Sequence, residues 1–238
     1  MKKDIVARLL AIVMIAAGLA VIDVSAQKAS GPGGRSDDAI RHSNKAADVI
    51  KDVMGAPDKG IPTDLLRRAE AVVVCPEVLK AAFGVGGHKG QCVVSRRRGN
   101  GWSTPVFYNM SGASIGPQIG GEKADFVMLV MNKGGLNGLM EDKFEMGGEA
   151  GVTAGPVGRK VSASTNATLD AGILSYSHSE GAFIGAALKG VAITPDNDLN
   201  EAYYGKKAKD LLGEGGAMPT VAAEVRALPD TLSRYSKS

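Results

Sequence analysis

The apolar and polar positions along the chain predict helices near both of its ends. Between Ser36 and Met54 the apolar residues fill one half of a helical wheel and mixed charges fill the other, which is typical of an amphipathic helix packed against a core. Ser36 is the expected N-cap of this helix. Shorter helices are expected at 63–69, 200–212 and 220–228.

The region between these helices predicts strands separated by glycine-containing turns. Residues 71–75 and 90–98 are strand-like, and the turn 99–101 (Gly-Asn-Gly) is expected to join 90–98 to 102–110 in a hairpin. Residues 126–131 are continuously apolar, so this strand is expected to be buried on both faces.

A regular alternation of apolar or small residues with polar residues runs from Val161 to Ile173. This pattern is typical of a strand with one buried and one solvated face. The strand is expected to continue through Tyr176, to turn near 179–181 and to return as 183–193. So long a strand fits a strongly twisted sheet or a barrel better than a flat sheet.

The glycine content agrees with a β-rich middle. Glycine supplies 32 of the 238 residues, roughly twice its usual share, and most of these glycines lie between Phe83 and Gly190. Each one costs a helix about 1 kcal/mol relative to alanine, which argues against a helical bundle in this region. We therefore predict an α+β fold, with a glycine-rich, mainly antiparallel curved sheet or barrel-like core and helices at the N- and C-terminal ends.

The first 26 residues have the features of an export signal. Three basic residues accompany an apolar run from Leu9 to Ile22, and Val24-Ser25-Ala26 matches the small-x-small cleavage pattern. A membrane anchor is the alternative, but this run is shorter than the roughly 20 residues that span a bilayer. We expect cleavage near Ala26, a flexible linker at 27–35 and one domain at 36–235, in a protein that is periplasmic or secreted and peripheral on a membrane of the cell envelope.

The charge balance argues against a nucleic-acid-binding protein. The chain has 28 Lys+Arg and 25 Asp+Glu, a net charge of +3. Removing residues 1–26 takes away three basic and two acidic residues, which leaves the balance near neutral. Nucleic-acid-binding domains carry a clear basic excess.

The two cysteines, Cys75 and Cys92, both lie in strand-like apolar stretches. Export permits a disulfide between them, and two buried thiols are the alternative; the sequence leaves both open. A zinc site that combined them with His88 would have only three ligands and an unusual spacing. No metal site is therefore expected.

No motif predicts a catalytic residue or a cofactor. Residues 112–116 (Gly-Ala-Ser-Ile-Gly) match the G-x-S-x-G pattern of serine hydrolases, in which the serine needs a tight strand-to-helix turn. Pro117 and further glycines follow and disfavour such a helix, so a serine esterase that uses Ser114 is the least favoured function. Residues 196–200 begin like a calcium loop but lack the later glycine and glutamate, and they predict a helix cap instead.

Basic residues beside predicted turns form the candidate binding site. Arg96, Arg97 and Arg98 adjoin the turn 99–101, and three more basic residues lie near other turns, namely Lys89, Arg159 and Lys160. A basic loop attracts anionic lipid headgroups, at about 1 kcal/mol per charge near the surface. A solvated hairpin tip is the alternative, and charge alone does not decide between them.

Five short motifs follow one another in an order that resembles a known family. They are Gly-Trp-Ser-Thr-Pro at 101–105, Gly-Pro-Gln-Ile-Gly at 116–120, Ala-Gly-Pro-Val-Gly-Arg at 154–159, Ser-Tyr-Ser-His-Ser-Glu-Gly-Ala-Phe at 175–183 and Asn-Glu-Ala-Tyr-Tyr-Gly at 200–205. This series resembles the SYLF domain, a lipid-binding and actin-associated domain of eukaryotic endocytic proteins that also occurs in exported bacterial proteins. The resemblance covers about residues 45–212.

The resemblance implies a non-enzymatic module that binds membrane phospholipids, with an N-terminal amphipathic helix and basic residues implicated in its eukaryotic members. The helix at 36–54 occupies the equivalent place. In an exported bacterial-type protein, phosphatidylglycerol or cardiolipin is the expected ligand, and actin is not an expected partner. We predict a phospholipid-binding module that uses basic loops, with this helix as a further contact. A structural or protein-interaction role in the cell envelope is the alternative.

Overall fold

The computed structural model describes residues 32–55, 60–147, 151–157, 171–179, 182–185, 188, 190–214 and 219–237. The expected export signal at 1–26 therefore lies outside the described residues, as do the alternating pattern from 161 to 170, Arg159 and Lys160. The residues from Pro32 to Ser238 form one compact unit.

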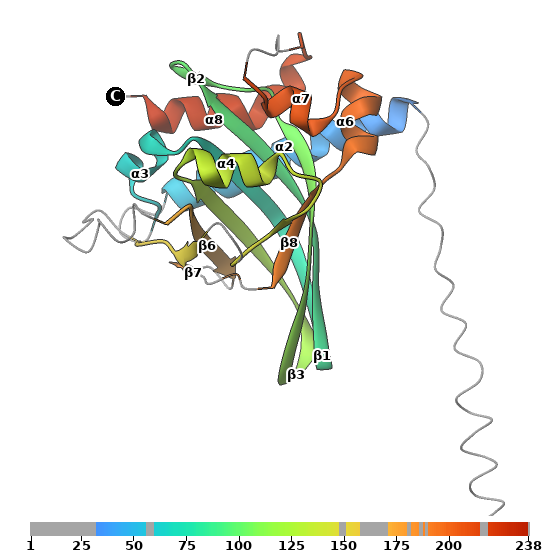
Figure 1. The fold of residues 1–238 in the computed structure, drawn as a ribbon, viewed down its shortest axis with the longest axis vertical. Helices are drawn as coiled ribbons and strands as arrows, with labels where there is room; N and C mark the ends of the chain where they lie inside the picture. Colours follow the sequence, from blue (N-terminus) through green and yellow to red (C-terminus); the bar gives the residue numbers. More distant parts are fainter. Residues whose placement is uncertain are drawn as a thin grey trace, which may run out of the picture. The chain divides into compact units, whose positions relative to one another are not determined.

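Helices begin and end the described chain, and strands fill its middle (Figure 1). The helices are α2 (Pro32–Gly55), α3 (Thr63–Arg68), α4 (Lys133–Leu139), α6 (Asn197–Tyr204), α7 (Ala208–Leu212) and α8 (Ala227–Ser236), which a 3-10 turn, η1 (Ala223–Arg226), precedes. The strands are β1 (Ala71–Arg98), β2 (Gly101–Trp102), β3 (Val106–Val130), β4 (Phe144–Glu145), β5 (Val152–Ala154), β6 (Ile173–Ser179), β7 (Ala182–Gly185) and β8 (Val191–Pro195).

The two longest strands, β1 and β3, form one antiparallel ribbon that doubles back on itself. Their pairing runs from Ala71↔Val130 to Val94↔Val106, with register shifts on β1 between Cys75 and Val78 and between Phe83 and Val85. Cys75 and Cys92 lie 17 residues apart in β1, which corresponds to roughly 55 Å in a straight strand. A disulfide joins them, and their Cα atoms are 4.0 Å apart. Both strands must therefore fold over midway, and in Figure 1 they run together to an end that extends away from the helices.

The doubled ribbon forms the centre of a curled, half-barrel sheet. One part of β3 pairs with β6 from Asp125 to Val130, and β6 in turn pairs with β5 and β7. The other part of β3 pairs with β8 from Tyr108 to Gly112, and β8 pairs with β4. Among the strands that the structure describes, only the short β5–β6 pair is parallel. The predicted α+β class, with a curved and mainly antiparallel sheet between terminal helices, is confirmed.

Both faces of the central strands are buried because alternate residues enter two different cores. On β1, Val72 and Val74 pack with the helices α2, α3 and α8. Their neighbours Val73 and Cys75 pack on the other side, with α4 and α7. The same alternation from Phe126 to Val130 confirms the expected burial of this strand on both faces.

The terminal helices differ from their predicted bounds for local reasons. α2 begins at Pro32, before the expected cap Ser36, and proline is favoured in the first turn because it has no N–H that needs a partner. The expected helix 200–212 is split, because Gly205 has a left-handed conformation (φ 66°) and ends α6. The return from β6 is also two strands, of which β7 pairs with β6 and β8 pairs with β3 and β4.

Tertiary contacts explain α4, a helix that the sequence does not predict because it contains three glycines. A Cβ atom on Gly135 would lie 2.8 Å from the carbonyl oxygen of Gly172, and one on Gly138 would lie 2.4 Å from the ring of Phe144. The side chain of Asn132 caps the helix by accepting a hydrogen bond from the Gly135 amide at 2.9 Å. Close packing therefore outweighs the low helix propensity of glycine here.

Gly90 provides a test of the doubled ribbon. A Cβ atom at this position would lie 2.7 Å from Val78 Cγ2 and 3.2 Å from Val78 Cα, whereas a Cβ atom on Gly87 would meet only the Gly112 carbonyl oxygen, at 3.5 Å. We expect Gly90→Ala to lower the free energy of unfolding by about 1–3 kcal/mol through overpacking. Gly87→Ala, the matched control on the same strand, should change it by less than about 0.5 kcal/mol. Urea unfolding measures both, and equal midpoints would contradict the close approach of the two halves of β1.

Candidate functional site

The structure uses the three arginines of the predicted hairpin site as internal contacts. Arg96 is only 7% exposed, and its guanidinium donates hydrogen bonds to the Leu212 carbonyl oxygen and, at 3.1 Å, to the Glu214 carboxylate. Arg98 donates to the carbonyl oxygens of Leu211 and Gly213. These acceptors lie at the C-terminal end of α7, where helices leave carbonyl groups without partners and favour positive charge.

Arg97 performs the same task at the end of α3. Its Nε donates to the Ala69 carbonyl oxygen at 2.9 Å and its Nη2 to the Leu66 carbonyl oxygen at 2.7 Å. The guanidinium also lies over the Trp102 ring, 4.1 Å from its centroid. Burial lowers the pKa of Arg97 from its ordinary value, although an arginine remains charged at neutral pH. All three hairpin arginines thus hold helix ends against the sheet.

Of the other predicted basic residues, Lys89 lies exposed on β1, and Arg159 and Lys160 fall outside the described ranges. The ribbon brings two further lysines into the same region. Lys80 is half-buried, with its Nζ 5.2 Å from the centroid of the Phe126 ring. Lys123 is exposed on β3, and its register partner is Leu79, an exposed large hydrophobic residue.

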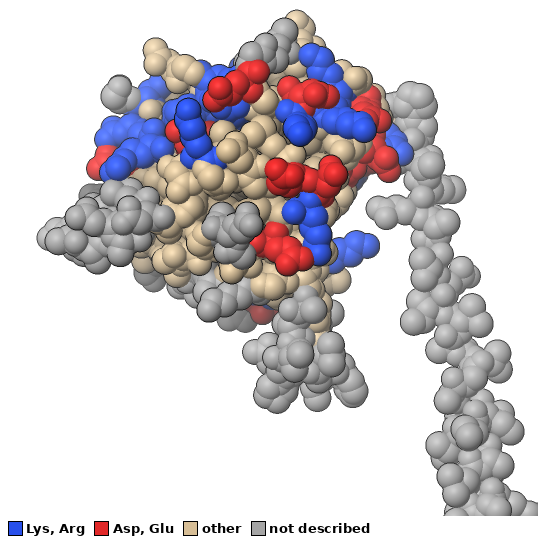
Figure 2. Space-filling model, viewed as in Figure 1, with Lys and Arg blue, Asp and Glu red and all other residues tan. Residues whose placement is uncertain are grey.

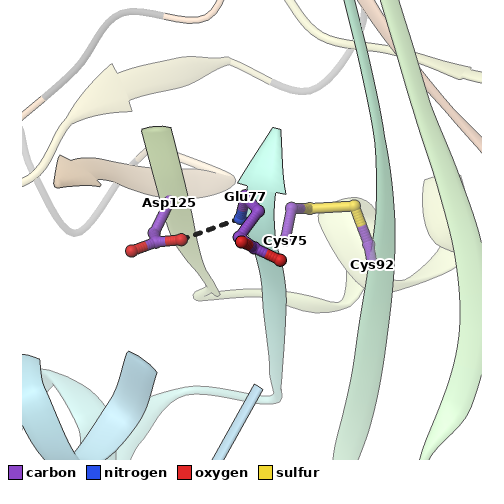
Figure 3. Close-up of a disulfide and its surroundings, with 4 residues drawn as sticks. All are labelled: Cys75, Glu77, Cys92 and Asp125. Carbon is purple, nitrogen blue, oxygen red and sulfur yellow. Dashed lines mark hydrogen bonds between the residues drawn. A yellow bond between two sulfur atoms is a disulfide. The ribbon is translucent and has the colours of Figure 1, made fainter. Parts of the chain in front are cut away.

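A charged cluster fixes the ribbon beside the disulfide (Figure 3). At the register shift after Cys75, Glu77 has a positive φ of 49°, and its backbone amide donates to Asp125 Oδ1 at 2.8 Å. The Glu77 carboxylate pairs with Lys45 of α2 and, at 3.3 Å, with Lys123. Hydrogen bonds from Lys45 and Lys123 hold the pKa of Glu77 below its ordinary value. The cluster therefore ties α2 to the ribbon.

The folded end of the β1–β3 ribbon lies beyond these residues and has no charged residue in its sequence. Residues 81–87 and 111–121 have no charged side chain, and the backbone pairs them from Ala81↔Gly121 to Gly87↔Ala113. His88 borders this end. Burial, with Lys80 nearby, lowers its pKa from 6.5, so it is neutral at pH 7. The sequence analysis did not identify this charge-free ribbon end bordered by lysines. The absence of charged residues between Lys80 and His88 is the sequence feature that could have indicated it.

The face of the described chain that Figure 2 shows mixes both signs of charge. In Figure 2, lysine and arginine side chains alternate with aspartate and glutamate over the helical part of the face shown. The polar side of α2 also carries both signs of charge, in i,i+3 pairs such as Lys51–Asp48 and Arg41–Asp38. No large field of one sign is visible on this face.

The apolar side of α2 is fully used by the core. Ala39, Ala46 and Val53 have no exposed surface, and Ile50 is 1% exposed. The hydroxyl of Ser43 donates to the Val225 carbonyl oxygen at 2.6 Å and accepts from the Leu228 amide at 3.2 Å. In this structure the amphipathic helix therefore offers a membrane only its mixed-charge side.

The described structure does not form a catalytic or metal site from the sequence motifs that resemble one. Ser114 lies inside β3, where its register partner is Gly86, so the strand-to-helix turn of a nucleophile elbow is not formed there. Asp196 caps α6 by accepting from the Leu199 amide at 3.1 Å, which confirms the helix-cap interpretation. Within the described ranges, no three His, Cys, Asp or Glu side chains are placed to hold a metal ion.

Arg97 allows the structural role of the hairpin arginines to be measured. Arg97→Lys keeps the positive charge but loses the fork that reaches two carbonyl groups, and we expect it to lower the free energy of unfolding by about 1–3 kcal/mol. Arg68→Lys, on the exposed end of α3, is the control, with an expected loss below about 0.5 kcal/mol. Urea unfolding of both variants checks this, and equal small losses would show that Arg97 does not hold α3.

Comparison with known proteins gives the same family as the five sequence motifs. The family model described as "Ysc84: Las17-binding protein actin regulator" matches residues 111–235. LAS seventeen-binding protein 3 of Saccharomyces cerevisiae S288c is 34% identical over 209 residues, which cover 82% of this chain and 45% of that protein. SH3 domain-containing YSC84-like protein 1 of Homo sapiens is 26% identical over 200 residues, which cover 80% of this chain and 58% of that protein.

The chain spans about half the length of the curated relatives it matches. Among the residues that the structure describes, no helix has the length and apolar character needed to cross a bilayer. The match of the family model to more than half of the chain and the identity to the yeast relative agree with the SYLF resemblance. The chain therefore belongs to the Ysc84 family of SYLF domains.

Proposed function

We propose that this chain is a phospholipid-binding module that contacts anionic membrane surfaces through the lysines at the folded end of the β1–β3 ribbon. One observation carries the proposal: Lys80, Lys89 and Lys123 border the charge-free ribbon end. The hairpin arginines already have acceptors within the protein, so they are not the main lipid contacts in this proposal.

These lysines supply part of the energy for reversible binding. Each basic residue near an anionic surface contributes about 1 kcal/mol, so three contribute about 3 kcal/mol, which repulsion from Glu122, the register partner of Lys80, reduces and apolar contacts must supplement. The attraction is screened within about 10 Å at 0.1 M salt. Binding should therefore require anionic lipid and should weaken as salt is raised.

Vesicle co-sedimentation tests this function. We expect the chain to sediment with vesicles of equal amounts of phosphatidylglycerol and phosphatidylcholine, to remain in the supernatant with phosphatidylcholine alone, and to be released by added salt. Lys89→Glu/Lys123→Glu should weaken binding by about 30-fold or more, because two attractive charges become repulsive. The control Lys133→Glu/Lys209→Glu changes the net charge equally at exposed positions of α4 and α7. Equal recovery in the supernatant under all conditions would overturn the proposal.

The proposal includes export of the chain and action on an envelope membrane. It is supported by the basic residues, apolar run and small-x-small pattern of residues 1–26. The Cys75–Cys92 disulfide is also suited to an oxidising compartment. We expect the mature protein to begin at Gln27 and to be recovered from the periplasm or the medium. N-terminal sequencing of the fractionated protein checks this, and an intact Met1 on cytoplasmic protein would contradict it.

A protein-binding role is the second candidate, and the names of the relatives favour it. The matched family is described as a Las17-binding actin regulator, and the yeast relative is named as a binding protein of the same partner. An exported chain would meet a different protein partner, in the cell envelope. A stoichiometric complex that forms without lipid and is unaffected by Lys89→Glu/Lys123→Glu would favour this candidate over lipid binding.

A further inference from the structure

The folded end of the β1–β3 ribbon suggests how deeply the module engages a membrane. Resting on the lipid-binding function proposed above, we infer that this end inserts into the boundary between headgroups and acyl chains and anchors the protein there. The end consists of residues 81–87 and 111–121, paired by their backbones. The three lysines then lie at headgroup level, above the inserted part.

The residue types at this end suit an apolar environment. The two segments contain Phe83, Val85, Ile115 and Ile119 among glycine and alanine, with Ser111, Ser114 and Gln118 as uncharged polar residues and Pro117 between them. Leu79 and Val157 are the exposed large hydrophobic residues of the described chain, and Leu79, at 48% exposed, lies two residues before the start of this end. Transfer of an exposed apolar side chain and the adjoining apolar segment from water to the membrane is favourable in free energy.

The charged residues that border the end fit a membrane better than an apolar pocket of a protein. Three lysines and one glutamate, Glu122, stand at the border, together with the neutral His88. Lysine can bury its aliphatic stem while its ammonium group stays at the level of anionic headgroups. A nearby acid, Glu77, is already paired with Lys45 and Lys123, which reduces its repulsion of such a surface.

The length of the charge-free end sets the depth of insertion. About four residues separate Lys80 from the fold of β1 near Phe83 and Val85, which corresponds to roughly 13 Å of strand. Half of a bilayer's hydrocarbon core is about 15 Å thick, so the end can enter one leaflet but cannot cross the membrane. An antiparallel ribbon also has outer edges whose backbone groups need partners, and these groups disfavour the deep hydrocarbon. Shallow insertion satisfies both limits.

A matched pair of charge substitutions tests the anchor. Leu79→Asp places a charge next to the inserted end, and Val157→Asp places the same charge at the other exposed large hydrophobic residue, which is 41% exposed. On vesicles of equal phosphatidylglycerol and phosphatidylcholine, we expect Leu79→Asp to weaken binding by at least 10-fold and Val157→Asp by less than 2-fold. Both variants should unfold at the wild-type urea midpoint because both positions are exposed. Equal effects of the two substitutions would overturn the anchor.

A fluorescence measurement reports insertion directly. Trp102 is the only tryptophan and is buried, so wild-type emission provides the baseline. In Phe83→Trp, we expect the emission to shift to the blue on those vesicles and to be quenched by lipids brominated near the headgroup end of the acyl chain, while the wild type is not quenched. Wild-type binding without quenching of Phe83→Trp would refute insertion and leave the proposed function intact. Absence of wild-type binding would overturn both.

Discussion

The doubling back of the β1–β3 ribbon is the constraint on which the rest of the structure depends. Because the two strands fold over together, one strand pair supplies the central segments of both parts of the sheet. The Cys75–Cys92 disulfide and the close contact of Gly90 with Val78 hold the two halves of β1 against each other. β6 and β8 then extend the sheet from different parts of β3, and the helices cover the faces that result.

This arrangement separates the structural charges from those available to a partner. The hairpin arginines bind the carbonyl ends of α3 and α7, 28 to 116 residues away in the sequence, and so fasten helices to the sheet. The apolar side of α2 is likewise used within the core. The lysines beside the folded ribbon end make surface contacts, such as the pair between Lys123 and Glu77, and they lie where apolar and uncharged residues meet positive charge. The proposed site is therefore a property of the ribbon's shape, which no single motif encodes.

The sequence predicted the features that local patterns determine and missed those that depend on distant contacts. The hairpin at 99–101 and the strand from Phe126 were predictable, because turn glycines and continuous apolar runs are local signals. The doubling back of β1 was not predictable: the sequence indicated separate strands at 71–75 and 90–98, and the glycines between them did not show that one strand continues through and folds onto itself. α4 contradicts glycine's propensity because its backbone must approach Gly172 and Phe144. The hairpin arginines looked available because their carbonyl acceptors cannot be identified from the alternation of β1.

The contact between α2 and the C-terminal elements has a consequence for how the chain folds. The hydroxyl of Ser43 bonds to Val225, 182 residues later, and Ala71 pairs with Val130. Contacts of such long sequence separation require large loops to close first and are associated with slow folding. During synthesis, α2 cannot complete its packing until α8 has been made. The apolar side of α2 therefore stays uncovered until α8 has been synthesised, and during that interval it is accessible to a chaperone that binds exposed apolar helices.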